Sequence, residues 1–378
     1  MKKKFMALSA ALALGLSPAA TLFNSKTSQP VQAASYDQSE MRTFVRSTMA
    51  KYKVRGSVLV VKDGIAQPIN YGYAWYGKRY GNGRSNIVYP TASLQKVITG
   101  AMIVQLINEK NNTSQSFSQY TKISRWYPNL KNADKISVGQ LLTHTSGIVA
   151  TGTEYNRGIN YSEQGAIDWI IDKINTTPEN EPGGYYYNNA NYMLLAGIIR
   201  KETNQSYQSN FNSRIINRLG LTNTYLYEDI PSWKTDAISY IWQNKNYQDA
   251  DYIKSTVASQ IVGAGNLFTT PLEYYRILQG MMNGQILSSS DFHYLTHLAS
   301  MSKDRDYSGG LYLYNNGNLK TAFGSIYGVH FNSWVQLTYD NQNGIIMFLN
   351  QTYNGKDNSK AAGYEILNHI KANTFVNK

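Results

Sequence analysis

Segments with the character of β-strands occur only near the two ends of this 378-residue chain, and the middle has a mainly helical pattern. In the N-terminal part, the apolar runs 56–61 and 65–73 flank Lys62-Asp63-Gly64, which predicts a β-hairpin. The C-terminal strand signals lie at 310–314, 332–339 and 344–350. We therefore expect an α+β fold: an antiparallel sheet formed by both chain ends and flanked by helices, with a mainly helical domain inserted.

The expected helices have apolar side chains that recur every three or four residues. The segment 91–109 follows Pro90 and has a broad apolar face. The other helical segments are 37–53, 137–143, 162–174, 189–203, 206–218, 271–283, 290–299 and 360–372. These limits predict a sheet domain of residues 34–92 and 260–378, a helical domain of residues 93–259, and an active site between them.

The first 33 residues have the pattern of a secretory signal peptide. Lys2, Lys3 and Lys4 precede an apolar run, and Val31-Gln32-Ala33 ends in small residues suited to cleavage. We expect an exported protein of the extracellular space, cell surface or cell wall, with membrane contact only through this segment if it is retained as an anchor. The chain has no cysteine, so an ordinary buried core must stabilise the exported part.

The net charge of the chain limits the classes of binding partner that we expect. The net charge is +12, and the leader contributes four lysines and no acid, so the exported part carries +8. Such an excess favours polyanionic partners. No compact stripe of Lys and Arg with interleaved aromatic residues is present, so nucleic acid is not expected. A polyphosphate polymer of the cell wall fits the charge, and the oligomeric state stays open.

Two short motifs carry candidate chemistry. In Ser93-Leu94-Gln95-Lys96, the i, i+3 spacing places a hydroxyl and an amine on one helix face. A serine becomes a nucleophile when a base takes its proton, and a lysine can be that base if burial lowers its pKa. Tyr187 and Asn189 precede an apolar helix; the tyrosine could relay the proton, and the asparagine could contact substrate or Lys96. Alone, the serine–lysine spacing is common, and a surface lysine is its ordinary explanation.

Five sequence motifs that occur in one order indicate a family more specifically than either short motif does alone. They are Ser93-x-x-Lys96, Leu141-Leu142-Thr143-His144-Thr145-Ser146-Gly147, Pro182-Gly183-x-x-x-Tyr187-x-Asn189-x-Asn191-Tyr192, Leu219-Gly220-Leu221-x-Asn223-Thr224 and Ala264-Gly265-Asn266-Leu267-x-Thr269. This order resembles the class C-type β-lactamase-related serine hydrolases, which include penicillin-binding D,D-carboxypeptidases, class C β-lactamases and D-amino-acid or D-alanyl esterases. The resemblance covers about residues 37–372.

The resemblance implies a role for each matching residue. Ser93 would be the acylated nucleophile, Lys96 its partner, Tyr187 the general base or proton shuttle, and Asn189 a supporting substrate contact. It implies the β-lactamase/penicillin-binding-protein-like fold and no cofactor. Enzymes of the serine–lysine type need no histidine, so His144 is interpreted as part of a structural turn.

A metal site is not expected either. His293 and His297 have the i, i+4 spacing that can hold a metal ion, but no third ligand is evident in the sequence.

The chain departs from the family at the third motif. Family members usually carry Lys-Thr-Gly or His-x-Gly on a strand that lines the site. Alignment on Phe323-Gly324 and on Phe331-x-Ser333-Trp334 places Ser325-Ile326-Tyr327 there, to within a residue or two. Ser325 and Tyr327 are therefore expected substrate contacts. No register leaves a cation at the first position, although His330 or Lys320 could fold into that role.

The missing cation shapes the substrate hypothesis. In the resembled carboxypeptidases and lactamases it helps to bind a free carboxylate. D-Alanine esterified to teichoic or lipoteichoic acid has no free carboxylate, so an esterase that releases D-alanine through a Ser93 acyl-enzyme is the leading hypothesis. The alternative is a D,D-carboxypeptidase or penicillin-binding protein that acts on peptidoglycan stem peptides. A second alternative is a non-catalytic protein that binds wall polymers, possible for a chain with 31 tyrosines but disfavoured by the intact Ser93, Lys96 and Tyr187.

Overall fold

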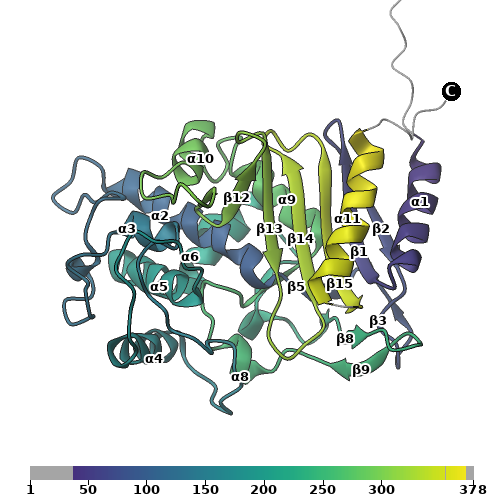
Figure 1. Cartoon of the computed structure of the whole chain (residues 1–378), viewed down its shortest axis with the longest axis horizontal. Coiled ribbons are helices and arrows are strands. Elements are labelled where there is room, and N and C mark those ends of the chain that lie inside the picture. Colours follow the sequence, from purple (N-terminus) through teal and green to yellow (C-terminus); the bar gives the residue numbers. More distant parts are fainter. Residues whose placement is uncertain (1–36, 354, 372–378) are drawn as a thin grey trace, which may run out of the picture.

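The computed structural model describes residues 37–353 and 355–371 (Figure 1). The expected signal peptide lies outside the described residues. A large sheet fills one half of the molecule and a group of helices fills the other half.

The large sheet contains strands from both ends of the chain. Its main path has the order β11-β12-β13-β14-β15-β1-β2. The bounds are β1 Arg55–Lys62, β2 Ile65–Tyr71, β11 Tyr307–Ser308, β12 Leu311–Tyr314, β13 Leu319–Gly324, β14 Asn332–Thr338 and β15 Gly344–Thr352. β1 pairs antiparallel with both β15 and β2, so the first strand of the chain joins the last. The predicted fold class is confirmed by this pairing.

Both faces of the sheet are covered, and the alternating side chains of β1 contribute to a separate core on each face. Val58 and Val60 belong to a core under α1 (Gln38–Lys51) and α11 (Gly355–Lys371), the helices of the two chain ends. Leu59 and Val61 point to the opposite face and join the main core. A strand that is buried on both faces is a continuous apolar run, as this one is.

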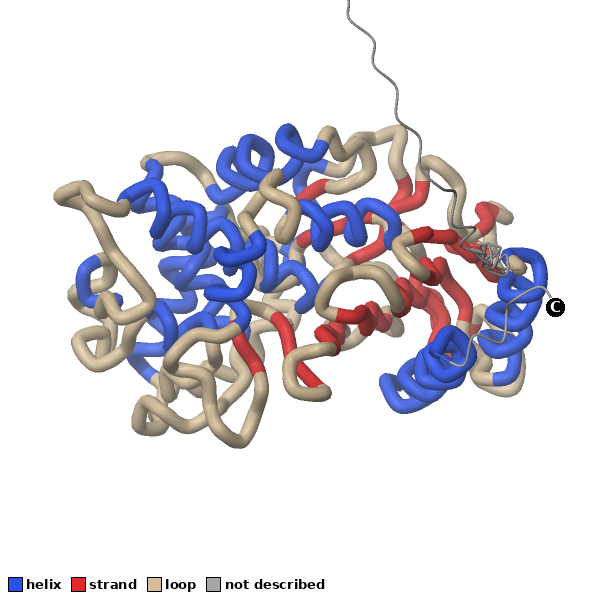
Figure 2. Tube along the Cα trace, turned by 90° about the horizontal axis from the view of Figure 1, so that it is seen from above, coloured by secondary structure: helices blue, strands red, loops and turns tan. Residues whose placement is uncertain are grey.

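The helical half contains α2 (Lys96–Lys110) and α5 (Asn189–Thr203) (Figure 1). Figure 2 shows most helices gathered on the left of the molecule and most strands to their right. Every α2 residue from Lys96 to Leu106 is buried, so this helix lies inside the molecule rather than on its surface. Further helices are α3 Val138–Leu142, α4 Glu163–Thr176, α9 Pro271–Gly280 and α10 Ser289–Thr296. The segment expected as one helix at 206–218 consists of α6 Tyr207–Phe211, a π-helical turn Asn212–Ile216 and α7 Asn217–Leu219.

Several short elements were not expected from the sequence. They are β3 Tyr73–Trp75, β4 Tyr80–Gly81, β5 Ile87–Pro90, β6 Tyr225–Leu226, β7 Thr235–Asp236, β8 Ser239–Ile241, β9 Gln248–Asp251, α8 Ser255–Ala258 and β10 Leu267–Thr269. Segments of two to four residues are too short to show a hydrophobic period. β8 and β9 extend the large sheet, because β8 pairs with β15, although both strands lie within the range 93–259 that the sequence assigns to the helical domain. Every helix that the structure describes is too short or too polar to span a bilayer.

Candidate active site

Ser93 lies on a tight turn between β5 and α2. The backbone N–H of Thr91 donates to the carbonyl of Leu267 at 2.8 Å, which fastens the end of β5 to β10. Ala92 then adopts φ +47°, a left-handed conformation that is strained for a residue with a side chain. The helical turn Ala92–Gln95 leads directly into α2. Ser93 therefore sits in a first helical turn, where backbone N–H groups lack intrahelical partners and can stabilise an oxyanion.

Lys96 is fully buried and its amine contacts the serine. Its Nζ donates to Ser93 Oγ at 2.9 Å, to Asn189 Oδ1 at 2.8 Å and to the carbonyl of Ala264 at 2.9 Å. Burial lowers the pKa of Lys96 to about 7, and the negative charge of Glu154 partly opposes that shift. An amine with such a pKa is neutral in a substantial fraction of molecules near pH 7 and can then accept the serine proton.

Tyr187 meets the same serine from the loop before α5. Its side chain lines the same cavity as Ser93, and Lys96 Nζ lies 5.0 Å from its ring centroid. The residue as a whole is 36% exposed, but desolvation of its hydroxyl raises the pKa of Tyr187 well above the ordinary value. At neutral pH this side chain is a phenol, which suits it to pass a proton rather than to act as a phenolate.

Asn189 links the lysine to an acidic residue. Its Oδ1 accepts from Lys96, while its Nδ2 donates to Thr153 Oγ1 at 3.1 Å and to Glu154 Oε1 at 2.8 Å. These partners fix the orientation of the amide, because the lysine requires an acceptor and the carboxylate requires a donor. The structure thus brings Ser93, Lys96 and Asn189 into one hydrogen-bonded chain.

His144 holds the Tyr187 segment in place. Its Nδ1 lies 3.3 Å from the backbone N of Asn188 and 2.9 Å from Asn191 Nδ2, and its ring centroid is 4.2 Å from that of Tyr187. Burial, with a further contribution from Lys96, lowers the pKa of His144 well below its usual value, so the imidazole is neutral. These contacts are structural and keep the ring behind Tyr187.

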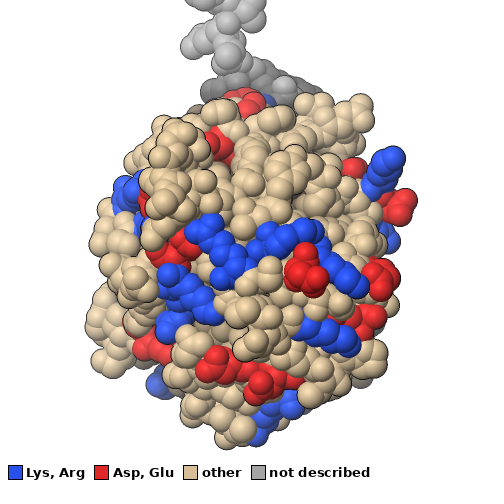
Figure 3. Space-filling view, turned by 90° about the vertical axis from the view of Figure 1, so that its left-hand side faces the viewer, with Lys and Arg blue, Asp and Glu red and all other residues tan. Residues whose placement is uncertain are grey.

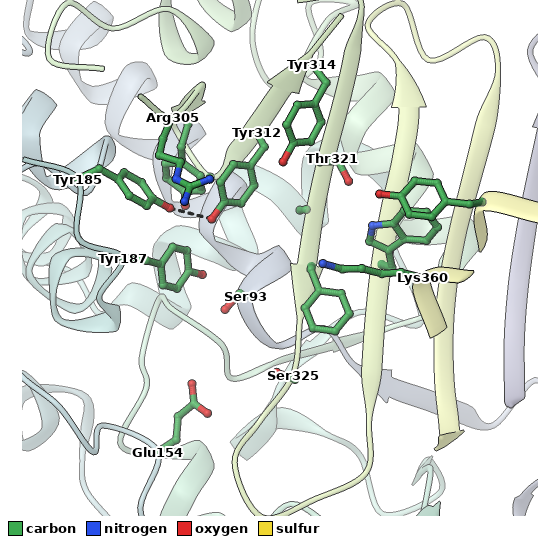
Figure 4. Close-up of a pocket in the computed structure, with 16 residues that line it drawn as sticks. Ser93, Glu154, Tyr185, Tyr187, Arg305, Tyr312, Tyr314, Thr321, Ser325 and Lys360 are labelled. Atoms are coloured by element: carbon green, nitrogen blue, oxygen red, sulfur yellow. Dashed lines mark hydrogen bonds between the residues drawn. The ribbon is translucent and has the colours of Figure 1, made fainter. Parts of the chain in front are cut away.

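A cavity of 540 Å³ opens above Ser93 (Figure 4). Its aromatic wall includes Tyr185, Tyr187, Tyr312 and Tyr314, and the Tyr185 and Tyr312 hydroxyls are hydrogen-bonded at 2.7 Å. The opposite wall is β13 with the side chains behind it.

The approach of β13 decides which residues of the third motif reach this cavity. A Cβ on Gly324 would lie 2.4 Å from the carbonyl oxygen of Thr91, so a glycine is needed where the strand passes the serine turn. Ser325 follows it and lines the cavity. The Tyr327 side chain instead packs on Tyr155, with ring centroids 4.9 Å apart, and lines a neighbouring pocket. Its backbone N–H donates to Glu154 Oε2 at 2.9 Å.

Neither basic residue considered for the missing cation lines the cavity. Lys320 points into the core and donates to the carbonyl of Tyr339 at 2.6 Å. The Nε2 atom of His330 lies 2.8 Å from Oδ2 of Asp249.

Three charged residues that sequence reasoning missed do line the cavity, namely Glu154, Arg305 and Lys360 (Figure 4). Glu154 and Arg305 come from loops and Lys360 comes from α11. None of them belongs to a recognisable motif, so their sequence neighbours carry no signal of a role in a site.

The described residues contain no group of three or more side chains able to hold a metal ion. His293 and His297 stack on each other with ring centroids 4.0 Å apart, and His297 Nδ1 lies 3.0 Å from the carbonyl oxygen of His293.

Comparisons with known proteins identify the family of the chain. A family model described as Beta-lactamase matches residues 41–368. The chain belongs to the Beta-lactamase family. Within this family it is 27% identical, over 282 residues, to a teichoic acid D-alanine hydrolase of Staphylococcus aureus (strain NCTC 8325 / PS 47), covering 73% of this chain and 67% of the relative.

Solved structures show the same fold. FmtA from Staphylococcus aureus superposes with a TM-score of 0.71 at 22% identity, covering 92% of this chain and 93% of the other. The D-amino acid amidase from Ochrobactrum anthropi SV3, in complex with D-phenylalanine, gives a TM-score of 0.72 at 19% identity, covering 89% and 100%. The chain is therefore a β-lactamase/penicillin-binding-protein-like member of a serine hydrolase family.

Proposed function

We propose that this chain is an exported esterase that removes D-alanine from teichoic or lipoteichoic acid through an acyl-enzyme on Ser93. The relative at 27% identity is a teichoic acid D-alanine hydrolase, which supports this substrate class. The basic leader and its apolar run support export, and the +8 charge of the remainder suits a polyanionic substrate. Figure 3 shows Lys and Arg side chains gathered in a band across one end of the molecule.

The observation that carries the proposal is the position of the Glu154 carboxylate in the cavity that contains Ser93. Glu154 lines this cavity (Figure 4). One carboxylate oxygen accepts from Asn189 Nδ2 and the other from the N–H of Tyr327, and each oxygen has a further lone pair with which to accept another hydrogen bond. A D-alanyl ester has a free α-ammonium group on its acyl part. The corresponding nitrogen of a stem peptide or a β-lactam is an uncharged amide. A carboxylate at this position therefore favours an aminoacyl ester.

The chemical steps follow from the contacts around Ser93. With Lys96 as the neutral amine, Ser93 Oγ attacks the ester carbonyl while its proton passes to Lys96, directly or through the phenol of Tyr187. The backbone N–H of the helical turn stabilises the oxyanion. The bond to the polyol oxygen breaks, the polyol takes the proton, and D-alanyl-Ser93 remains. A water molecule, deprotonated by the same pair, then releases D-alanine.

The direct test is incubation of the purified protein with D-alanylated lipoteichoic acid, with free D-alanine as the readout. We expect release by the wild type and none by Ser93→Ala. The absence of release by an enzyme that a serine-directed fluorophosphonate still labels would refute the esterase. Covalent labelling by a fluorescent penicillin, together with cleavage of a D-Ala-D-Ala pentapeptide, would identify a carboxypeptidase instead. Polymer binding that is equal in wild type and Ser93→Ala, with no fluorophosphonate labelling, would identify a binding protein.

A further inference from the structure

Basic and aromatic side chains gather on the hairpin of β3 and β4, on the side of the molecule opposite to α3 and α4 (Figure 1). The turn between the two strands carries Lys78 and Arg79, Arg84 follows β4, and all three residues are exposed. No acidic residue occurs in the sequence between Asp63 and Glu109. At the helical end, by contrast, Figure 3 shows acidic side chains among the basic ones. The hairpin therefore has an excess of positive charge that its own segment does not balance.

Each of these three cations lies over an aromatic ring. The distances from the Lys Nζ or Arg Cζ atom to the ring centroid are 3.9 Å for Lys78 and Trp75, 4.2 Å for Arg79 and Tyr76, and 4.3 Å for Arg84 and Tyr80. Such a contact orients the cation and leaves N–H donors for other partners. Among the described residues, no carboxylate forms an ion pair with Lys78, Arg79 or Arg84. The rings therefore position three cations that can still bind an anion.

Tyr247 brings a distant part of the chain to the same surface. Its ring stacks on that of Tyr76, with the centroids 4.4 Å apart and an interplanar angle of 10°, and its hydroxyl accepts from the N–H of Tyr73 at 3.1 Å. The Cζ atom of Arg55 lies 5.3 Å from the centroid of the Tyr247 ring, so a fourth cation joins the group.

This grouping differs from what the sequence led us to expect. We expected no compact arrangement of Lys and Arg with aromatic residues, and that expectation is wrong, because the fold packs residues 55, 73–84 and 247 together. Asp249 is the acidic residue nearest to Tyr247 in the sequence, and its Oδ2 lies 2.8 Å from Nε2 of His330 rather than beside one of the four cations.

We infer that Arg55, Lys78, Arg79 and Arg84 form a second binding site, which we call the β3–β4 surface, for the phosphodiester chain of a polyol-phosphate polymer. Guanidinium and ammonium groups bind phosphate oxygens through charge-assisted hydrogen bonds, and neighbouring cations can bind successive phosphates of one chain. None of the four residues lines the catalytic cavity, so this site is separate from that of Ser93. The choice of polymer rests on the proposed function, whereas the binding itself requires no catalysis.

Two other polyanions fit the β3–β4 surface less well. Nucleic acid that is bound without sequence preference stacks its bases on free aromatic rings, but these rings already contact cations or, for Tyr76 and Tyr247, each other. Binding to an anionic membrane uses apolar side chains that enter the bilayer. Of the rings in this group, only Tyr76 belongs to an exposed residue, and its backbone N–H donates to the hydroxyl of Tyr240 at 2.9 Å. A polymer of polyol and phosphate needs neither stacking nor insertion.

The test measures the Kd for soluble polyglycerol phosphate by isothermal titration calorimetry, with the full chain carrying Ser93→Ala so that only binding is observed. Adding Lys78→Gln, Arg79→Gln and Arg84→Gln together should raise this Kd by about 10- to 100-fold at about 50 mM salt. The slope of log Kd against log salt concentration should fall by about 2, because three phosphate contacts are lost.

The matched control is the triple variant Lys122→Gln, Lys131→Gln and Lys135→Gln. It removes the same charge from exposed positions between α2 and α3, and it should change the Kd by less than about 3-fold.

The hairpin variant with an intact Ser93 gives a second readout. A polymer held at the β3–β4 surface keeps its other units at a high effective concentration near the enzyme, whereas a small ester gains nothing from that surface. We therefore expect a raised KM for D-alanylated polymer. The rate of fluorophosphonate labelling and kcat/KM for a small D-alanyl ester should match those of the wild type, which also shows that the variant is folded.

An unchanged Kd in the hairpin variant, or an equal loss of affinity in the control variant, would overturn the β3–β4 surface. Tighter binding of oligothymidylate or of phosphatidylglycerol vesicles, at the same phosphate concentration, would assign the surface to nucleic acid or to a membrane and overturn it too. The two proposals fail separately. Polymer binding that depends on the hairpin, without release of D-alanine by the intact enzyme, refutes the esterase alone. Release of D-alanine with an unchanged polymer affinity in the hairpin variant refutes the surface alone.

Discussion

The coupling between Glu154 and Lys96 predicts a measurable shift of the pH–rate profile. Lys96 acts as a base only when it is neutral, and its pKa is about 7, so the wild-type rate should rise with pH through a limb centred near that value. The charge of Glu154 favours the ammonium form and raises this pKa. Glu154→Gln removes the charge, so the limb should move to lower pH.

The size of the shift follows from the hydrogen-bond chain. The distance from Lys96 Nζ to Asn189 Oδ1 is 2.8 Å, and the distance from Asn189 Nδ2 to Glu154 Oε1 is also 2.8 Å. The two polar atoms of the amide are roughly 2.3 Å apart, so the charges are separated by at most roughly 8 Å. At that distance, and with an effective dielectric constant of about 20 to 40, the interaction is about 1 to 2 kcal/mol, or about one pH unit.

The assay is kcat/KM between about pH 5 and about pH 9 with a chromogenic propionyl ester. That substrate has no amine, whereas the amine of a D-alanyl ester would itself titrate in this range. Asp172→Asn removes one negative charge from an exposed position on α4 and is the matched control, for which no shift is expected. A limb that stays in place in Glu154→Gln would refute the coupling. A wild-type profile without a limb near pH 7 would refute Lys96 as the base.

Other perturbations give distinct outcomes. Tyr187→Phe should lower kcat by about 100-fold or more through loss of proton transfer, with an unchanged Tm; full activity would exclude the shuttle. Gly324→Ala should impair acylation by a fluorophosphonate, because the new Cβ would lie 2.4 Å from the carbonyl oxygen of Thr91; wild-type labelling would show that the strand can shift. Lys320→Met should raise the free energy of unfolding in urea, most at low pH. Burial lowers the pKa of Lys320 to about 7, so the unfolded state binds more protons between that pH and the lysine's usual pKa. The stability of the wild type therefore rises with pH across this window, by roughly 5 kcal/mol at most, and the variant should lose this slope; an equal slope in both proteins would contradict the reasoning.

Local sequence patterns predicted the elements that are long enough to repeat. The hairpin of β1 and β2, the helix after Pro90 and the helix at 189–203 all appear close to their expected limits, because each has a hydrophobic period over several residues. The short strands β5 and β10 could not be expected in this way. They form because the backbone of each finds a partner far along the chain, as in the pairing of Phe268 with Pro90.

In the candidate site too, the sequence predicted some features, and others depended on the tertiary structure. The contact between Ser93 and Lys96 follows from helical spacing alone, and Tyr187 and Asn189 were expected from the order of the sequence motifs. The positions of Ser325 and Tyr327 depended on how β13 ends: it brings Ser325 to the cavity and turns the Tyr327 side chain away.

By itself, the sequence determined the fold class, the helix that places a serine and a lysine on one face, and the absence of a cation from the third motif. The tertiary structure decided the rest. Lys96 has a pKa near 7 because the packed protein removes water from its amine, and Glu154, Arg305 and Lys360 share one cavity because the sheet and helices close around it. Periodicity is a local property of the chain, whereas desolvation and the meeting of distant charges depend on which segments pack together.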